Sequence, residues 1–215
     1  MKLFIANKNY SSWSLRVWLA LRVKGIPFSE DLRAFDVENE YADFLEFSPT
    51  GKVPVLVDQG RTLWESLAIL EYVAETRPQA GLWPEDEATR AEARCAAHEM
   101  HAGFLPLRAA CPVNLRRRVE ALPVDAAVQK DVRRIETLWE SCLESYGGPF
   151  LFGSDFTIAD AMYAPVVNRL KVYELSRTQA VRDYSATITS LDAWQEWEAA
   201  ARAEPWTVDI DEVYA

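Results

Sequence analysis

Three serines near the start of the chain are spaced so that their hydroxyl groups would gather at the beginning of one helix. They lie in Asn9-Tyr10-Ser11-Ser12-Trp13-Ser14, between a strand-like run at residues 3–7 and an amphipathic run at residues 14–24. A helix N-terminus stabilises an anion, and a thiolate there has a lowered pKa, more so when a hydroxyl donates to the sulfur. The segment therefore predicts either an activation site for a thiol or side-chain caps for the helix, which is the commonest role of serine there.

A proline stands inside a second strand-like run, Lys52-Val53-Pro54-Val55-Leu56-Val57. Proline cannot donate to a sheet, so this run belongs at an edge or a bulge. A cis peptide bond before Pro54 is one way to turn the preceding backbone outward, towards a ligand. The alternative is an ordinary bulged edge strand with Lys52 in solvent.

A Glu-Ser pair, Glu65-Ser66, comes directly before the apolar run Leu67-Ala68-Ile69-Leu70. We expect Ser66 to be the N-cap of a helix that continues through Glu75, with free backbone N–H groups behind it that suit an anion. Taken alone, the pair also fits a simple helix start.

The elements that must position these residues follow from periodicity. Before residue 78 the chain alternates strands and helices, at residues 3–7, 14–24, 28–33, 38–46, 52–57, 62–64 and 66–75. Residues 76–84 fit neither the helical nor the strand spacing of apolar residues. After them we find only helical runs, at residues 87–110, 125–146, 158–173 and 191–203. These runs predict an α/β domain at residues 1–78, a linker at 79–86 and an all-α domain at 87–215.

Composition excludes several classes of protein. The formal charge of −10 and the isoelectric point near 4.8 argue against a nucleic-acid partner, because phosphate neutralisation requires clustered Lys and Arg. The short Arg116-Arg117-Arg118 run is expected to be a solvated helix end or a partner for nearby carboxylates. Without an apolar run of about 20 residues or a signal peptide, we expect a soluble cytoplasmic protein with no membrane partner.

Metal and disulfide chemistry are not expected. Cys95, Cys111 and Cys142 are odd in number and lack Cys-x-x-Cys spacing. His98 and His101 would need carboxylates from elsewhere to hold a metal ion, so we expect ordinary surface or pocket histidines.

The order of elements in residues 1–78, with a proline opening the third strand, resembles the thioredoxin-like half of the glutathione S-transferase superfamily, and the resemblance covers the whole chain. It implies a thioredoxin-like α/β domain followed by an all-α helical-bundle domain. The serine run is similar to the Ser-Ser-Cys-Ser-Trp-Arg stretch of zeta-class transferases. That similarity implies that Ser11 activates glutathione, with Ser12 as the adjacent alternative and Tyr10 as a third candidate.

The resemblance also implies how the tripeptide would bind. The Val53–Pro54 peptide would be cis, so that the Val53 backbone pairs with the cysteinyl part of glutathione, and Lys52 would approach the glycyl carboxylate. Ser66 would receive the γ-glutamyl carboxylate and Glu65 the ammonium group. The second-substrate cleft would be lined by a further set of residues, Trp13, Met100, His101, Phe104 and Arg108.

The activity implied is conjugation of glutathione to an electrophilic small molecule by a homodimer. Glutathione-dependent isomerisation, peroxide reduction and non-catalytic binding on the same fold are the alternatives. Zeta-class enzymes carry a cysteine where this chain has Trp13, which disfavours the maleylacetoacetate isomerase group. A capping box, Thr157 with Asp160, matches the family at the start of a helix and is expected to be structural.

Overall fold

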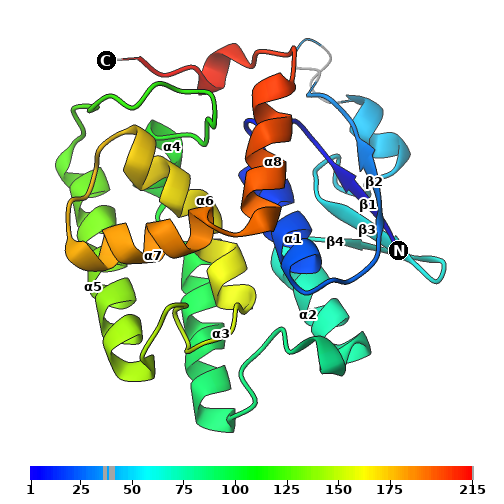
Figure 1. The fold of residues 1–215 in the computed structure, drawn as a ribbon. Coiled ribbons are helices and arrows are strands. Elements are labelled where there is room, and N and C mark those ends of the chain that lie inside the picture. Colours follow the sequence, from blue (N-terminus) through cyan, green and yellow to red (C-terminus); the bar gives the residue numbers. More distant parts are fainter. Residues whose placement is uncertain (36–37, 39–41, 215) are drawn as a thin grey trace.

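A four-stranded mixed sheet is formed by the first third of the chain, in the order β2-β1-β3-β4 (Figure 1). The computed structural model describes residues 1–35, 38 and 42–214. Its first elements are β1 (Lys2–Ile5), α1 (Ser12–Val23), β2 (Ser29–Leu32), η1 (Ala42–Glu46), β3 (Val55–Asp58), β4 (Arg61–Trp64) and α2 (Ser66–Thr76). β1 pairs with β2 in parallel and with β3 antiparallel, and β3 pairs with β4 antiparallel. The expected helix at residues 38–46 lies partly outside the described residues.

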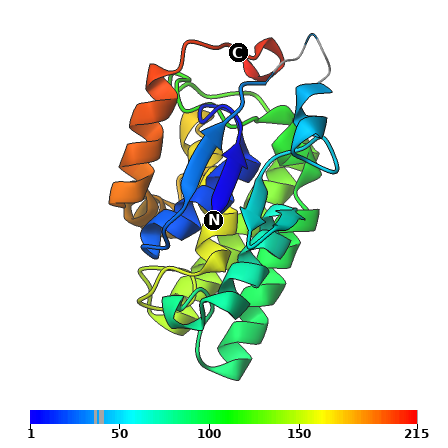
Figure 2. The same ribbon diagram turned by 90° about the vertical axis from the view of Figure 1, so that its right-hand side faces the viewer.

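The helix α1 lies at the centre of the molecule, between the sheet and the helices that follow (Figure 2). Leu15, Trp18 and Leu19 are fully buried, because α1 packs against the sheet layer on one side and against α6 and α8 on the other. Burying apolar side chains on both sides of one helix fixes the position of that helix between its neighbours. The start of α1 is where the candidate serines lie.

The rest of the chain is helical. It contains α3 (Glu87–Ala102), α4 (Leu105–Ala110), α5 (Ala126–Tyr146), α6 (Ile158–Val172), α7 (Gln179–Thr189), α8 (Asp192–Ala203) and the short turn η3 (Asp209–Asp211). Among the described residues after 86, strand-type pairing is limited to an isolated bridge between Phe150 and Gly153. The expected fold class is confirmed, whereas the division into domains at residues 78 and 87 stays a prediction.

Two helix predictions were wrong. The single helix expected at residues 87–110 is two helices, because Pro106 cannot continue a helix and its ring would collide with the carbonyl of Ala102. The break places Phe104 at a φ of 57°. α7 was not predicted at all.

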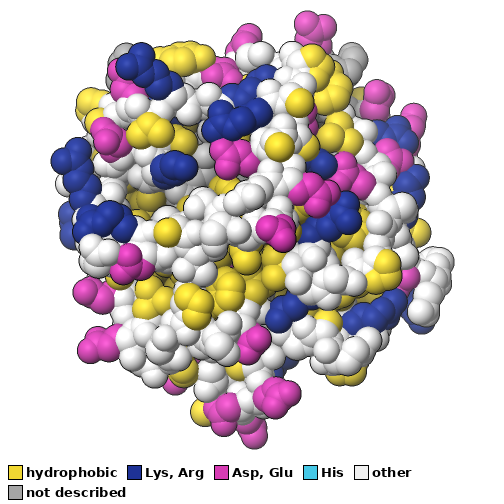
Figure 3. Space-filling view, viewed as in Figure 1, with side chains coloured by type: hydrophobic (Ala, Val, Ile, Leu, Met, Phe, Trp, Pro, Cys, Tyr) yellow, Lys and Arg dark blue, Asp and Glu magenta, His cyan; other side chains and the backbone are white. Residues whose placement is uncertain are grey.

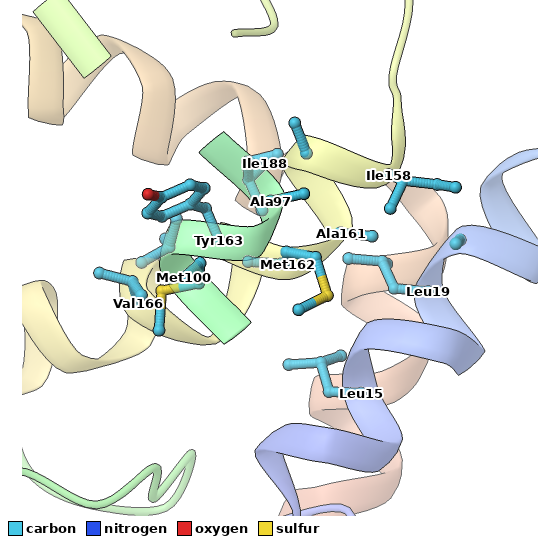
Figure 4. Packing of buried hydrophobic residues seen from close by; sticks show 14 of the residues in the cluster. Leu15, Leu19, Ala97, Met100, Ile158, Ala161, Met162, Tyr163, Val166 and Ile188 are labelled. Atoms are coloured by element: carbon cyan, nitrogen blue, oxygen red, sulfur yellow. The ribbon is translucent and has the colours of Figure 1, made fainter. Parts of the chain in front are cut away.

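One continuous core joins the two parts of the chain. Every residue of α6 except Lys171 is buried, and its Met162 faces Leu15 and Leu19 of α1 (Figure 4). The Arg16 Nε of α1 donates a hydrogen bond to the carbonyl oxygen of Met162 at 3.1 Å. Helix α1 is therefore held rigidly from both sides.

The molecular surface mixes charges of both signs. On the face in Figure 3, Lys and Arg side chains are interspersed with Asp and Glu. In the described part of the chain, no helix is both long and apolar enough to cross a membrane.

Candidate functional site

Ser11 and Ser12 lie at the start of α1 but make different contacts. Ser11 is the N-cap: its hydroxyl oxygen accepts from the Ser14 amide at 3.3 Å and donates to the Ser14 hydroxyl at 2.7 Å. Ser14 in turn accepts from the Ala6 amide at 3.2 Å. Ser12 is the first residue of α1, half-buried, and its hydroxyl has no hydrogen-bond partner among the described residues. Ser12 can therefore donate without giving up a bond.

Tyr10 is bound elsewhere. Its buried hydroxyl donates to Glu212 at 2.5 Å and accepts from the Arg116 guanidinium at 2.8 Å. Arg116 also donates to the carbonyl oxygens of Glu204 and Trp206, at 2.7 and 2.5 Å. Arg116 is thus neither of the two things expected of it, a solvated helix end or a hydrogen-bond partner for carboxylates, because its hydrogen bonds within the described residues go to a hydroxyl and to backbone carbonyl oxygens. It is a structural clamp instead.

These bonds fix a C-terminal segment, residues 204–214, over the end of the molecule where α1 begins (Figure 1). The Glu204 carboxylate accepts from the backbone amides of Lys8 and Asn9, at 2.6 and 3.1 Å. The Trp197 indole donates to the carbonyl oxygen of Lys8 at 2.9 Å. The loop before the serines is therefore anchored by residues almost 200 positions later in the chain.

The Val53–Pro54 peptide is cis, as expected. The turn before it is closed by Ser48, whose hydroxyl donates to the Lys52 carbonyl oxygen at 2.6 Å and accepts from the Lys52 amide at 3.0 Å. Lys52, Val53 and Pro54 all line the same pocket.

Ser66 is not the N-cap of α2, contrary to expectation. Glu65 holds that position, at a φ of 67°, and Ser66 is the first helical residue. A positive φ at a non-glycine residue is costly and persists only where the surroundings impose it, often at functional sites. The Ser66 hydroxyl is buried and has no partner within the described residues. Since buried hydroxyls are normally bonded, this oxygen is available to a ligand.

Two arginines contact the ring of Trp13. The guanidinium carbons of Arg16 and Arg108 lie 4.2 and 4.7 Å from its ring centroid, and the His101 ring meets it edge-on at 5.4 Å. His101 Nε2 is 3.7 Å from the Glu65 carboxylate. Burial, and then the charge of Arg16, lower the pKa of His101. The histidine that contacts the Glu65 carboxylate is thereby kept neutral to a lower pH than an ordinary histidine.

Two pockets, each of about 290 Å³, meet at Trp13, Lys52 and Val53. We call the first the polar pocket; its residues are Trp13, Thr50, Lys52, Val53, Pro54, Trp64, Glu65, Ser66 and Arg108. We call the second the apolar pocket; its residues are Tyr10, Ser11, Ser12, Trp13, Phe35, Phe44, Gly51, Lys52, Val53, Val208, Ile210 and Asp211. The residues expected to bind the tripeptide and to activate its thiol thus line these two adjoining pockets, which we call together the cleft.

Two residues proposed for the second-substrate side lie elsewhere. Met100 is fully buried beside Tyr163 and Val166 of α6 (Figure 4), and Phe104 is buried with its ring centroid 6.4 Å from that of Tyr163. Met100 is on the face of α3 that packs against α6, and Phe104 is buried where the chain turns between α3 and α4. Sequence reasoning missed three lining residues of the C-terminal segment, for which there is no local signal: Val208, Ile210 and Asp211.

Two buried guanidinium groups lie behind the cleft. Arg16 and Arg169 are almost fully buried, and the Nη1 of each has no partner among the described residues. Arg16 is under Trp13, and burial lowers its pKa well below the ordinary value, with the charges of Arg169 and Arg108 acting in the same direction. Such a cluster attracts an anionic group to this side of the cleft.

Comparison with known proteins finds one family. The model of the glutathione S-transferase N-terminal domain matches residues 10–76, and that of the C-terminal domain matches residues 89–203. A protein of Caenorhabditis elegans named probable maleylacetoacetate isomerase is 32% identical over 189 residues, which cover 86% of this chain and 87% of that protein.

Solved structures share the fold. A glutathione transferase homologue from Burkholderia strain BGR1, with bound glutathione, superposes with a TM-score of 0.71 at 24% identity, covering 94% of this chain and 98% of that one. A maleylacetoacetate isomerase from Methylobacterium extorquens AM1, with bound malonate and GSH, gives a TM-score of 0.71 at 24% identity, covering 97% and 100%.

Proposed function

Because the chain belongs to the glutathione S-transferase family, we propose that it binds glutathione in the polar pocket and transfers it to an electrophilic small molecule in the apolar pocket. The chain is an enzyme of this family. The observation that carries the proposal is the Ser66 hydroxyl, which is buried, without a partner in the described part of the chain, and aligned with the start of α2. A carboxylate would supply the missing bond and meet the positive end of the helix dipole.

The polar pocket suits the tripeptide from end to end. Ser66 would donate to the γ-glutamyl carboxylate, and the exposed Glu65 carboxylate would accept from the ammonium group. The Val53 backbone would pair with the cysteinyl residue as an added strand does. Lys52, with no ion-pair partner among the described residues, would approach the glycyl carboxylate.

The cysteinyl sulfur would then lie where the two pockets meet, at the start of α1. The helix N-terminus favours the thiolate, and a donated hydroxyl hydrogen bond lowers its pKa further. Ser12 can supply that bond directly, whereas Ser11, the residue implied by the resemblance, would first have to exchange its bond to Ser14. Both serines remain candidates, with Ser12 favoured by its free hydroxyl.

Trp13, at the junction of the pockets, and Arg108, in the polar pocket, would contact the second substrate. His101 lines neither pocket and would act through its contact with Trp13. Arg108 lines the polar pocket, and its charge, with those of the buried Arg16 and Arg169 behind it, would favour an electrophile that carries a carboxylate. Glutathione-dependent isomerisation of such a compound is therefore the second candidate function. An isomerase activity agrees with the name of the Caenorhabditis elegans relative, a probable maleylacetoacetate isomerase. It runs against the expectation that Trp13, in place of a cysteine, disfavours that group. Peroxide reduction and non-catalytic binding have no comparable support.

We further propose a cytoplasmic homodimer that takes part in detoxification, built from a glutathione-binding domain at residues 1–78, a linker and a helical domain at residues 87–215. Static light scattering should give about twice the chain mass of 24.4 kDa. A monomer at micromolar concentration would contradict the dimer.

Two measurements test the function. Titration calorimetry should detect glutathione binding at one site per chain, and a panel of electrophiles that includes aryl halides, enones and unsaturated carboxylates should show turnover with glutathione. Binding without turnover of any compound would favour the non-catalytic alternative. If glutathione itself does not bind, the proposal is wrong.

A further inference from the structure

We propose that Asp211 is the proton donor for those electrophiles that gain negative charge when the thiolate adds to them. This inference rests on the proposed function of the cleft. Asp211 lines the apolar pocket together with Ser12 and Trp13. Its half-buried carboxyl group has no hydrogen-bond partner among the described residues, so both oxygens are available to a bound molecule.

The position of Asp211 is fixed from both sides. Its backbone amide donates to the Val208 carbonyl oxygen at 2.9 Å. The next residue, Glu212, accepts from the Tyr10 hydroxyl, one position before Ser11. The clamp that holds the C-terminal segment therefore also holds a carboxyl group in the pocket that contains the start of α1.

Among the described residues, the charges that act on Asp211 or share its pocket come from three elements. Arg169 of α6 lies behind it, Glu212 is its neighbour in the C-terminal segment, and Lys52 of the turn before β3 lines the same pocket. Burial raises the pKa of Asp211, Glu212 acts in the same direction, and Arg169 opposes both. The net direction is upward, so the carboxyl group retains its proton to a higher pH than an exposed aspartic acid does.

The reaction that needs this proton is conjugate addition. The thiolate sulfur forms a bond to the β-carbon of an α,β-unsaturated carbonyl compound, and the π electrons of the C=C bond move towards the carbonyl to give an enolate. The Asp211 O–H proton passes to the enolate, which leaves a carboxylate that is reprotonated by solvent. In substitution on an aryl halide, the sulfur–carbon bond forms and halide leaves, and no proton is required. Asp211 should therefore distinguish the two reactions.

The experiment compares an enone and an aryl halide as substrates over a range of pH, in the wild type, Asp211→Asn and Asp209→Asn. Both substrates need the same thiolate, so the ratio of their kcat/KM values cancels the thiol ionisation. In the wild type this ratio should fall as the pH rises. In Asp211→Asn the ratio should be at least about tenfold lower at acidic pH and independent of pH, and Asp211→Glu should restore the slope.

Asp209 is the matched control, since it lies on the same turn, is exposed and lines neither the polar nor the apolar pocket. Its variant should keep the wild-type ratio and slope. Two outcomes would overturn the role of Asp211 and leave the proposed function standing. The first is a wild type that turns over the aryl halide but whose kcat/KM ratio does not change with pH. The second is an equal loss of kcat/KM for both substrates in Asp211→Asn. A wild type that turns over neither substrate contradicts the proposed function, and this inference with it.

Discussion

The hydroxyl group of Ser11 lies 2.7 Å from the hydroxyl group of Ser14, and its oxygen also accepts from the Ser14 amide. This pair closes the first turn of α1, and the bond from the Ala6 amide to Ser14 ties that turn to the end of β1. Ser12, the next residue after the cap, takes no part in this arrangement. Ser11 thus caps the helix, and the neighbouring Ser12 has the hydroxyl group that the proposed activation of the thiol requires.

Single alanine variants separate the tasks. Ser12→Ala should raise the pH midpoint of the ultraviolet thiolate absorbance of bound glutathione and reduce turnover, while thermal unfolding stays close to that of the wild type. Ser11→Ala should lower the free energy of unfolding by about 0.5–2 kcal/mol, because the helix loses its cap. The outcome against this assignment is a shift of the midpoint in Ser11→Ala alone, which would support the zeta-like alignment. Tyr10→Phe should leave the midpoint unchanged.

Ser66→Ala should weaken glutathione binding without destabilising the protein. The Ser66 hydroxyl has no partner among the described residues, so its removal costs the free protein little. In the complex, a hydrogen bond to a charged carboxylate is lost, which is worth about 1.5–3 kcal/mol or roughly a 10- to 150-fold rise in Kd by calorimetry. Ser141→Ala, on α5 and outside both pockets, is the control. An unchanged Kd would remove Ser66 from the site.

His101 should titrate below the ordinary histidine pKa of about 6.5. His98→Gln leaves His101 as the only histidine, so its proton NMR titration can be assigned directly. Trp13→Ala should raise this pKa, because burial is the largest cause of the shift and Trp13 covers the ring. No change in that variant would show that Trp13 does not contribute to the burial.

The same shift has a consequence for stability. The unfolded chain takes up this proton at a higher pH than the folded one does. The free energy of unfolding should therefore fall as the pH drops through about 6.5, and His101→Gln should reduce that fall. Denaturant unfolding of both proteins at several pH values measures this change in the free energy of unfolding.

Asp160→Ala should be among the most destabilising substitutions. Fully buried, Asp160 accepts from the amides of Leu151 and Thr157 and from the hydroxyls of Thr157 and Tyr184, at 2.8–3.0 Å. Without Asp160 these buried donors have no acceptor, so we expect the free energy of unfolding, measured with denaturant, to fall by about 3 kcal/mol or more. Asp155→Ala, in the exposed part of the same loop, should cost less than about 0.5 kcal/mol. Equal losses would contradict the structural role of the capping box.

Sequence reasoning succeeded where a local signal carries the structure. The proline at 54, the break at residues 76–84 and the Thr157–Asp160 capping box each act within a few residues, and the cis peptide bond and the capping box were found as expected. α7 was missed although its buried residues, Val181, Tyr184 and Ile188, have the i, i+3, i+7 spacing of an amphipathic helix. The break between α3 and α4 was missed although Pro106 indicates it, because the helical spacing of apolar residues continues on both sides of Phe104.

The site was harder to predict in two ways. The position of Ser66 depends on the positive φ of Glu65, and a glutamate in the sequence does not indicate such a backbone conformation. The C-terminal segment reaches the cleft only through long-range bonds, such as those of Arg116, and periodicity contains no information about them. The residues expected near the sulfur were found around one cleft, but Val208, Ile210 and Asp211 could come only from the structure.

The bonds from Glu204 to the Lys8 and Asn9 amides also order events during protein synthesis. The residues of the sheet and of α1 leave the ribosome long before Glu204 is made. While translation continues, the loop that carries Ser11 and Ser12 lacks the carboxylate that fixes its backbone. We therefore expect that a nascent chain which already contains the whole sheet does not yet have the proposed thiol site in order, and that the loop is fixed only when Glu204, the residue after α8, binds it.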